Sequence, residues 1–129
     1  MIFILFFTRF SWRTLVILCV VLTSLRWYLV GILNTNFIGQ LFAQCLHAFS
    51  FGLFHIIAMR VIFQNFSAGQ QGRGQALYST MWGLGVALGS ILAGHYWDIV
   101  SGEWIFIFAG LSTLIGLCFI WGLPKQLES

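Results

Sequence analysis

Charged side chains are scarce in this sequence. Only 7% of its 129 residues are charged, whereas 60% are hydrophobic, and a typical soluble domain has about 25% charged residues. So few charges cannot cover the surface of a water-soluble globule, which excludes a soluble enzyme, a disordered tail and a secreted disulfide scaffold. The six basic residues are scattered, without the Lys/Arg cluster of a nucleic-acid-binding surface. The composition therefore indicates an integral membrane protein embedded in the lipid bilayer.

Proline and cysteine are also rare. The single proline, Pro124, follows the last long apolar run and is expected to end it. Three cysteines, Cys19, Cys45 and Cys118, are far apart within apolar runs, which predicts free, buried thiols. We expect neither a metal site nor a cofactor.

Four apolar runs are each long enough to cross a bilayer, which requires about 20 residues. Short polar segments separate them, and they predict spans at about 15–33, 37–63, 76–97 and 104–123 within a single transmembrane domain, 1–129. Continuous runs favour helices over the alternating segments of a strand barrel. The sequence thus predicts an all-α polytopic membrane protein. Residues 1–7 are apolar but too few to span. We interpret them as a partial helix, the end of a preceding span, so that the chain is a truncated piece of a longer protein; a short interfacial anchor is the alternative.

Basic residues flank the spans on one side only. Arg9 and Arg13 precede the first span, Arg60 and Arg73 border the middle loop, and Lys125 follows the last span. Because Lys and Arg accumulate on the cytoplasmic side, we expect both termini to be cytoplasmic in a multi-pass protein of the inner, or plasma, membrane. Arg9, Arg13 and Arg73 are assigned to cytoplasmic loops.

Polar residues recur at helical spacing in the second predicted span. Gln40, Gln44, His47, Phe51 and His55 follow steps of four, three, four and four, which places them on one helix face. Such a stripe lines an aqueous cavity or forms interhelical hydrogen bonds. We favour the cavity, because the stripe includes two histidines.

Arg26 and three glycines complete the candidate residues. Arg26 lies about two residues from the middle of its predicted span, where a charge costs roughly 2.5 to 3.5 kcal/mol; it needs an anion, carbonyl groups or Gln side chains as partner. Gly85 and Gly89 form a GxxxG motif beside Gly83, a pattern typical of close helix packing. In a moving protein these glycines would also allow helices to slide.

Several of these segments resemble one family. They are LRW at 25–27, AQCLHA at 43–48, FGLFH at 51–55 and GRGQALYS at 72–79, followed by Gly83, Gly85 and Gly89. In order and spacing the chain resembles the C-terminal half of a major facilitator superfamily transporter. It is most similar to the branch of phenylpropionate permease-like and nucleoside-proton symporter-like proteins, which is related to lactose permease.

The resemblance implies a register and a function. Residues 1–7 would end helix eight of a twelve-helix fold, and the four spans would be helices nine to twelve. The expected function is secondary active, proton-coupled transport of a small solute by alternating access, with a missing N-terminal half as partner. Arg26 and His47 would belong to the proton-coupling network, and Gln40, Gln44 and His55 to the same substrate and proton pathway.

Three other functions remain open at this stage. A small stand-alone membrane subunit would complete itself by oligomerising. A haem-ligating redox anchor needs two histidines on facing helices, and His47 and His55 share one helix. An intramembrane protease could use Ser50 near His47, but Ser50 lacks the flanking glycines of a nucleophile elbow.

Overall fold

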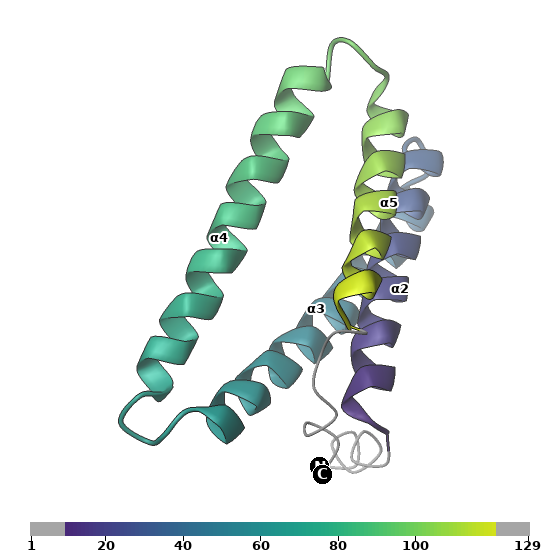
Figure 1. Cartoon of the computed structure of the whole chain (residues 1–129). Helices are drawn as coiled ribbons and strands as arrows, with labels where there is room; N and C mark the ends of the chain where they lie inside the picture. Colours follow the sequence, from purple (N-terminus) through teal and green to yellow (C-terminus); the bar gives the residue numbers. More distant parts are fainter. Residues whose placement is uncertain (1–9, 121–129) are drawn as a thin grey trace.

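The computed structural model describes residues 10–120, which form four α-helices. These are α2 (Trp12–Ile32), α3 (Phe37–Asn65), α4 (Gln71–Tyr96) and α5 (Gly102–Ile120). Consecutive helices run in opposite directions and are joined by short turns (Figure 1). All four are long and apolar enough to cross a membrane, which confirms the all-α architecture with four spans. The predicted partial helix at 1–7 and the end of the fourth span at 121–123 lie outside the described residues.

Two helices begin three or more residues earlier than the apolar runs indicated, and α5 begins two residues earlier. The α2 helix begins at Trp12, where the Ser11 side chain accepts a hydrogen bond from the Thr14 N–H at 3.3 Å. The α4 helix begins at Gln71. The apolar run marks only the part of a helix that lies in the hydrocarbon core. The helix itself extends into the polar flanking sequence, because the backbone N–H and C=O groups there also need hydrogen-bond partners. Arg13 and Arg73, predicted in loops, therefore lie in the first turns of α2 and α4.

The α2 helix lies between α3 and α5 and packs along both. A small core of Leu15, Cys19, Leu53 and Ile57 joins α2 to α3. Against α5, the buried Ser24 hydroxyl donates a hydrogen bond to the Gly110 carbonyl at 3.0 Å. These contacts make α2, α3 and α5 the packed part of the described chain.

The α2–α5 contact depends on one glycine from each helix. A Cβ at Gly110 would lie 3.1 Å from the Tyr28 ring, and a Cβ at Gly31 would lie 3.2 Å from the Phe106 Cβ. Both distances are shorter than ordinary van der Waals contact. The absence of side chains at these positions thus lets the two backbones approach.

The α4 helix stands apart from α2 and α5. Among the α4 residues only Gly74 is buried, where it packs under Ile62 and Phe66 at the end of α3. From there α4 leans away from the packed helices, and it returns to α5 only through the turn at its other end (Figure 1). Most of its surface is left for lipid or for other helices. Of the cysteines, Cys19 is buried, but Cys45 and Cys118 are exposed, because each faces away from the neighbouring helices of this chain.

The two ends of the helix assembly differ in chemistry. At the end where α2 and α4 begin, the Arg60 guanidinium lies 4.6 Å from the centre of the Trp12 ring, and Arg13 is in the first turn of α2. At the opposite end, Asn34 donates a hydrogen bond to Glu103 at 3.0 Å, which joins the α2–α3 turn to α5. Within residues 10–120 the basic helix ends and the acidic turn are thus separated by the length of the helices. Arg9 and Lys125 lie outside the described residues.

Candidate functional site

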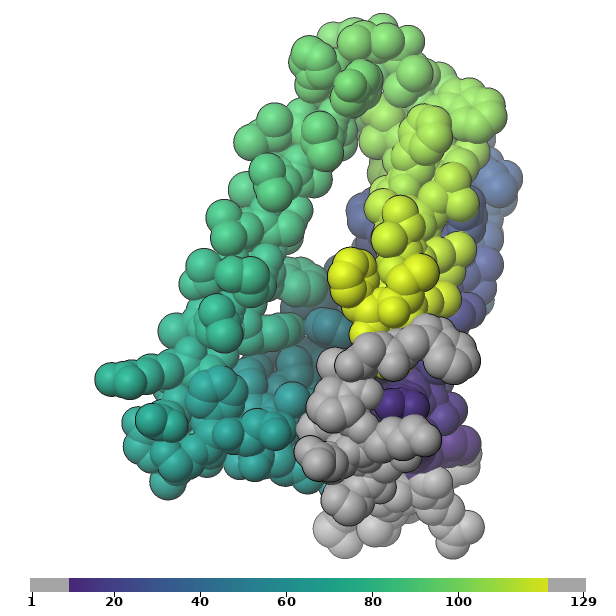
Figure 2. All heavy atoms as spheres, in the orientation of Figure 1, coloured from purple at the N-terminus to yellow at the C-terminus, as the bar shows by residue number. Residues whose placement is uncertain are grey.

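All four helices contribute to one cavity of about 970 Å³. It lies in the space between α4 and the packed helices, and Figure 2 shows an opening on the side between α4 and α5. Its lining is mainly apolar and aromatic, with a few polar side chains. Those polar side chains are Thr23, Arg26, Gln44, His47, Ser50, Ser90 and Thr113. The chain therefore builds a mostly apolar cavity with one strongly charged group in its wall.

Arg26 supplies that charge. Its side chain is 7% exposed, and its guanidinium carbon lies 3.9 Å from the centre of the Trp27 ring. The buried Nε has no hydrogen-bond partner within residues 10–120. An unpartnered buried polar group costs about 1 to 3 kcal/mol, and more when it is charged. The Arg26 Nε thus lacks an acceptor among the described residues.

The position of Arg26 along α2 differs from the sequence estimate. Since α2 begins at Trp12 and ends at Ile32, its midpoint falls at Leu22. Arg26 is therefore about 6 Å beyond that midpoint, towards the α2–α3 turn, at 1.5 Å per residue. The Arg26 residue is still buried there, although it lines the cavity.

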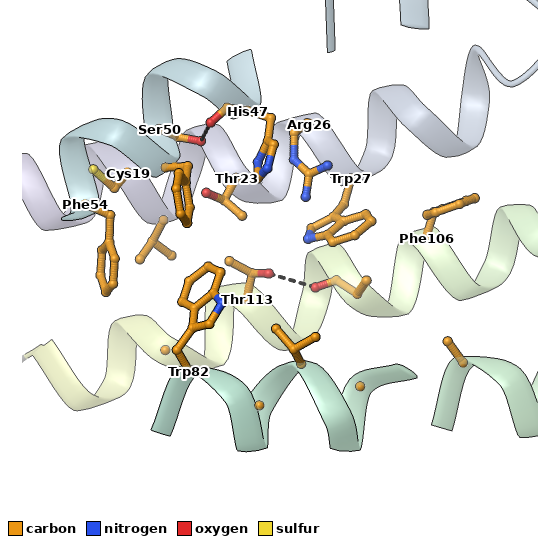
Figure 3. Close-up of a pocket in the computed structure, with 18 of the residues that line it drawn as sticks. Cys19, Thr23, Arg26, Trp27, His47, Ser50, Phe54, Trp82, Phe106 and Thr113 are labelled. Atoms are coloured by element: carbon orange, nitrogen blue, oxygen red, sulfur yellow. Dashed lines mark hydrogen bonds between the residues drawn. The ribbon is translucent and has the colours of Figure 1, made fainter. Parts of the chain in front are cut away.

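His47 projects into the same cavity from α3. Figure 3 shows its imidazole and the Arg26 guanidinium pointing into the same space. The His47 ring also lies 5.7 Å from the Phe51 ring. One helix turn along, the Ser50 hydroxyl donates a hydrogen bond to the His47 carbonyl at 3.3 Å. That bond occupies the Ser50 proton with the backbone, so the geometry gives no support to a serine nucleophile activated by histidine.

The residues of the polar stripe of α3 have three different surroundings: the cavity, the end of α2 and, for His55, the α4 helix. Gln44, His47 and Phe51 line the cavity. Gln40 does not: its amide donates hydrogen bonds to the Val30 and Leu33 carbonyls, each at 3.0 Å. Val30 is in the last turn of α2 and Leu33 is the residue that follows the helix; carbonyls at a helix end have no partner inside the helix. Gln40 therefore closes the end of α2 instead of lining the cavity.

His55 lies at the other end of the stripe and contacts α4. Its Nδ1 is 3.4 Å from the Tyr78 hydroxyl, and its ring stacks on Phe51 with 6.2 Å between centroids. Phe51 in turn meets Trp82 of α4 edge to face at 5.2 Å. His55 is not among the cavity-lining residues. Its contacts join α3 to α4 beside the cavity.

Aromatic rings form much of the cavity wall, a feature the sequence reasoning missed. Trp27 of α2 stacks on Phe106 of α5 at 5.8 Å, and Trp97 meets Phe106 edge to face at 6.2 Å. Trp82 enters from α4 on the opposite side (Figure 3). A signal for Trp82 was present: it shares a face of α4 with Gly85 and Gly89 at helical spacing.

The glycines of α4 make no close helix contact within residues 10–120. A Cβ at Gly83, Gly85 or Gly89 would meet nothing within 4 Å, so these residues do not pack against another of the four described helices. Gly85 and Gly89 line the cavity instead. The close helix contact is made by Gly31 and Gly110, which belong to no spaced motif on a single helix.

No group of three metal-ligating side chains exists in the part of the chain that the structure describes. Each histidine ring contacts an aromatic ring and not another histidine: His47 meets Phe51, His55 meets Phe51 and Tyr78, and His95 meets Tyr96. This arrangement offers no pair of facing axial ligands for a haem.

A family comparison matches most of the chain. The model of the MFS_1 like family matches residues 2–108. No curated protein and no solved structure matches the chain.

Proposed function

Because the chain belongs to the MFS_1 like family, within the major facilitator superfamily, we propose that it takes part in proton-coupled secondary transport of a small solute. The transport would proceed by alternating access across the inner, or plasma, membrane, without chemical change to the solute. The protein acts in this proposal as a transporter and not as an enzyme.

The observation that carries the proposal is the pairing of Arg26 and His47 in one cavity. They project from α2 and α3 into the same space. Arg26 keeps its charge at all working pH values, whereas histidine ordinarily titrates near pH 6.5. When His47 is protonated, two positive charges face one mostly apolar space, and an anionic group between them is strongly favoured. Proton and solute then increase each other's affinity by the same factor, which is the requirement for symport.

Movement of α4 would open and close the cavity in this proposal. The α4 helix contacts α3 through Gly74, Tyr78 and Trp82, while Gly85 and Gly89 leave its middle free of contact. A helix held at its ends but not along its middle can tilt with few contacts broken. The glycines thus support a gating role more than a packing role.

Further helices would complete the transport unit. The exposed face of α4 and the opening beside α5 leave the cavity without a wall on one side. We propose that the N-terminal half of a twelve-helix transporter covers this side. The same exposed face favours a second candidate, a stand-alone subunit that completes the cavity with another copy of itself. Cross-linking of the chain alone in lipid vesicles separates the two, since only the second gives a defined homo-oligomer.

Reconstituted vesicles that contain the complete transport unit, this chain together with the helices that cover its open side, test the proposal. With an imposed pH gradient, a transported solute should accumulate inside, and a protonophore should abolish the accumulation. His47→Gln should retain downhill exchange but lose accumulation, and Arg26→Gln should lose both. Arg60→Gln is the matched control, because Arg60 also stacks on a tryptophan but lies outside the cavity. Accumulation by His47→Gln equal to that of the unaltered chain would reject the coupling role of His47.

A further inference from the structure

We propose that Trp27 is a positioning residue of the cavity: its indole face, backed by Phe106, fixes the Arg26 guanidinium in the orientation that receives an anion. The inference rests on the proposed function, because it concerns how the cation of that same cavity is oriented. It is carried by the contact between Arg26 and Trp27, by the burial of Arg26 and by the rings that hold Trp27.

Helix spacing alone does not bring Arg26 and Trp27 together. Consecutive residues of a helix do not face each other, yet the Arg26 guanidinium carbon lies 3.9 Å from the centre of the Trp27 ring. The side chain of Arg26 therefore turns sideways to lie over the ring of its neighbour. A cation and a ring face attract each other most strongly where water is excluded, and Arg26 is buried. This attraction selects one orientation among the many that an arginine side chain can adopt.

An indole face holds a guanidinium without neutralising it. A carboxylate partner would accept the N–H groups of the guanidinium and offset its charge, whereas the ring attracts the cation through its face. No Asp or Glu is among the described residues that line the cavity, and the Arg26 Nε has no acceptor within residues 10–120. Among the described residues the guanidinium thus keeps its charge and at least one N–H donor for an anion in the cavity.

Trp27 is itself held by the rings beside it. It stacks on Phe106 of α5 with an interplanar angle of 20°, and Figure 3 shows Trp27 next to both Arg26 and Phe106. Phe106 is fixed in turn, because a Cβ at Gly31 would lie 3.2 Å from the Phe106 Cβ and Trp97 meets the Phe106 ring edge to face. A fixed indole presents its face to the guanidinium in one place. Anion binding then costs less, since the arginine side chain is already ordered.

Nuclear magnetic resonance of the full chain in detergent tests the positioning role. The Arg26 Nε–H signal of a chain labelled with ¹⁵N-arginine is assigned by its loss in Arg26→Lys, and it is followed as sodium formate is added at constant ionic strength. Formate is the smallest carboxylate, so it probes the guanidinium and no other part of a solute. We expect the Arg26 signal to shift saturably with formate, because the charged N–H group binds the carboxylate.

Matched variants separate the ring face from simple packing. Trp27→Leu removes the face and should weaken formate binding about five- to tenfold, whereas Trp27→Phe retains a face and should stay within about twofold of the unaltered chain. Trp12→Leu is the matched control, because Trp12 forms the same kind of contact with Arg60 outside the cavity; it should leave the Arg26 response unchanged. Circular dichroism and gel filtration establish that each variant is folded. If Trp27→Leu does not fold, Phe106→Leu takes its place, with a loss of about two- to threefold because Trp27 then lacks its backing ring.

The outcomes distinguish this inference from the proposed function. Equal formate binding by the unaltered chain and a folded Trp27→Leu or Phe106→Leu variant would overturn the positioning role, even if proton-driven transport is found. Equal losses in Trp27→Leu and Trp27→Phe, or no saturable shift in the unaltered chain, would do the same. Formate binding that depends on the Trp27 ring, without transport by the complete transport unit, would support the positioning role and leave the transport proposal to fail alone.

Discussion

The substitution Gly110→Val tests the contact between α2 and α5. A Cβ at Gly110 would lie 3.1 Å from the Tyr28 ring and 3.3 Å from the Ser24 carbonyl oxygen. The two γ-methyl groups of valine would extend further into the same contact. The helices must then separate, which stretches the 3.0 Å hydrogen bond from the Ser24 hydroxyl to the Gly110 carbonyl.

The expected loss of stability follows from three contributions. Overpacking costs about 1 to 3 kcal/mol, and an interhelical hydrogen bond in a membrane protein contributes about 0.6 kcal/mol. Valine is about 0.3 to 0.5 kcal/mol better than glycine within a helix, which offsets part of the loss. The free energy of unfolding should therefore fall by about 1 to 3 kcal/mol.

Unfolding in mixed micelles with increasing SDS, followed by far-ultraviolet circular dichroism, measures this change. Gly83→Val is the control, since a Cβ at Gly83 meets nothing within 4 Å and Gly83 is not a cavity-lining residue. The same change in helix propensity then occurs without the contact, and stability should stay equal or rise slightly. Ser24→Ala combined with Gly110→Val should be less damaging than the sum of the two, because both act on one contact. Equal destabilisation by Gly83→Val and Gly110→Val would refute the α2–α5 contact.

Three further outcomes are expected. Gln40→Leu removes both hydrogen bonds to the end of α2 and should lower the free energy of unfolding by about 1 to 2 kcal/mol, whereas Gln44→Leu should change it little; equal effects would contradict the assignment of Gln40. Tyr78→Phe removes the hydroxyl that meets α3, so amide hydrogen exchange in the first half of α4 should become about threefold faster, and unchanged exchange would argue against the contact. With the native cysteines replaced, Cys introduced at Ser67 should react with an impermeant maleimide only from the cytoplasmic side and Cys introduced at Thr35 only from the opposite side; the reverse pattern would invert the proposed orientation.

The number and type of the elements could be predicted from the sequence because the bilayer imposes a simple rule. A span needs an apolar run of fixed length, and every backbone group must be bonded within the helix. The beginnings of α2 and α4 could not be predicted from hydropathy alone, since Ser11 and Gln70 begin helices in polar sequence. Asn36 is a clearer boundary: its side chain accepts the Gly39 N–H at 2.9 Å, as expected of an N-cap residue.

The candidate site was predictable only where the sequence fixes a helix face. Spacing placed Gln40, Gln44, His47 and His55 on one side of α3, but it could not tell which of them faces a cavity and which faces a helix end. The Gln40 partners, Val30 and Leu33, lie at the end of another helix. Spacing also does not show whether a glycine of α4 faces another helix or the cavity.

Helix contacts between distant segments were the least predictable feature. The GxxxG spacing of Gly85 and Gly89 is the same whether the facing surface is a helix or an open cavity. Gly31 and Gly110 are single glycines on helices far apart in the sequence, so only the three-dimensional arrangement brings them into one contact. Periodicity within one helix contains no information about its partner.

The α2–α5 contact also dictates an order of assembly. Its hydrogen bond joins Ser24 and Gly110, which are 86 residues apart in the chain. During synthesis, α2 and α3 can pair as soon as both are inserted, but the α5 side of α2 must wait until three more helices have been made. Until then Ser24 and Gly31 face lipid or the insertion machinery. Before α5 is made, the α5 side of α2 is thus an uncovered face with a polar group, and a chaperone or insertase that shields this face would raise the yield of the folded protein.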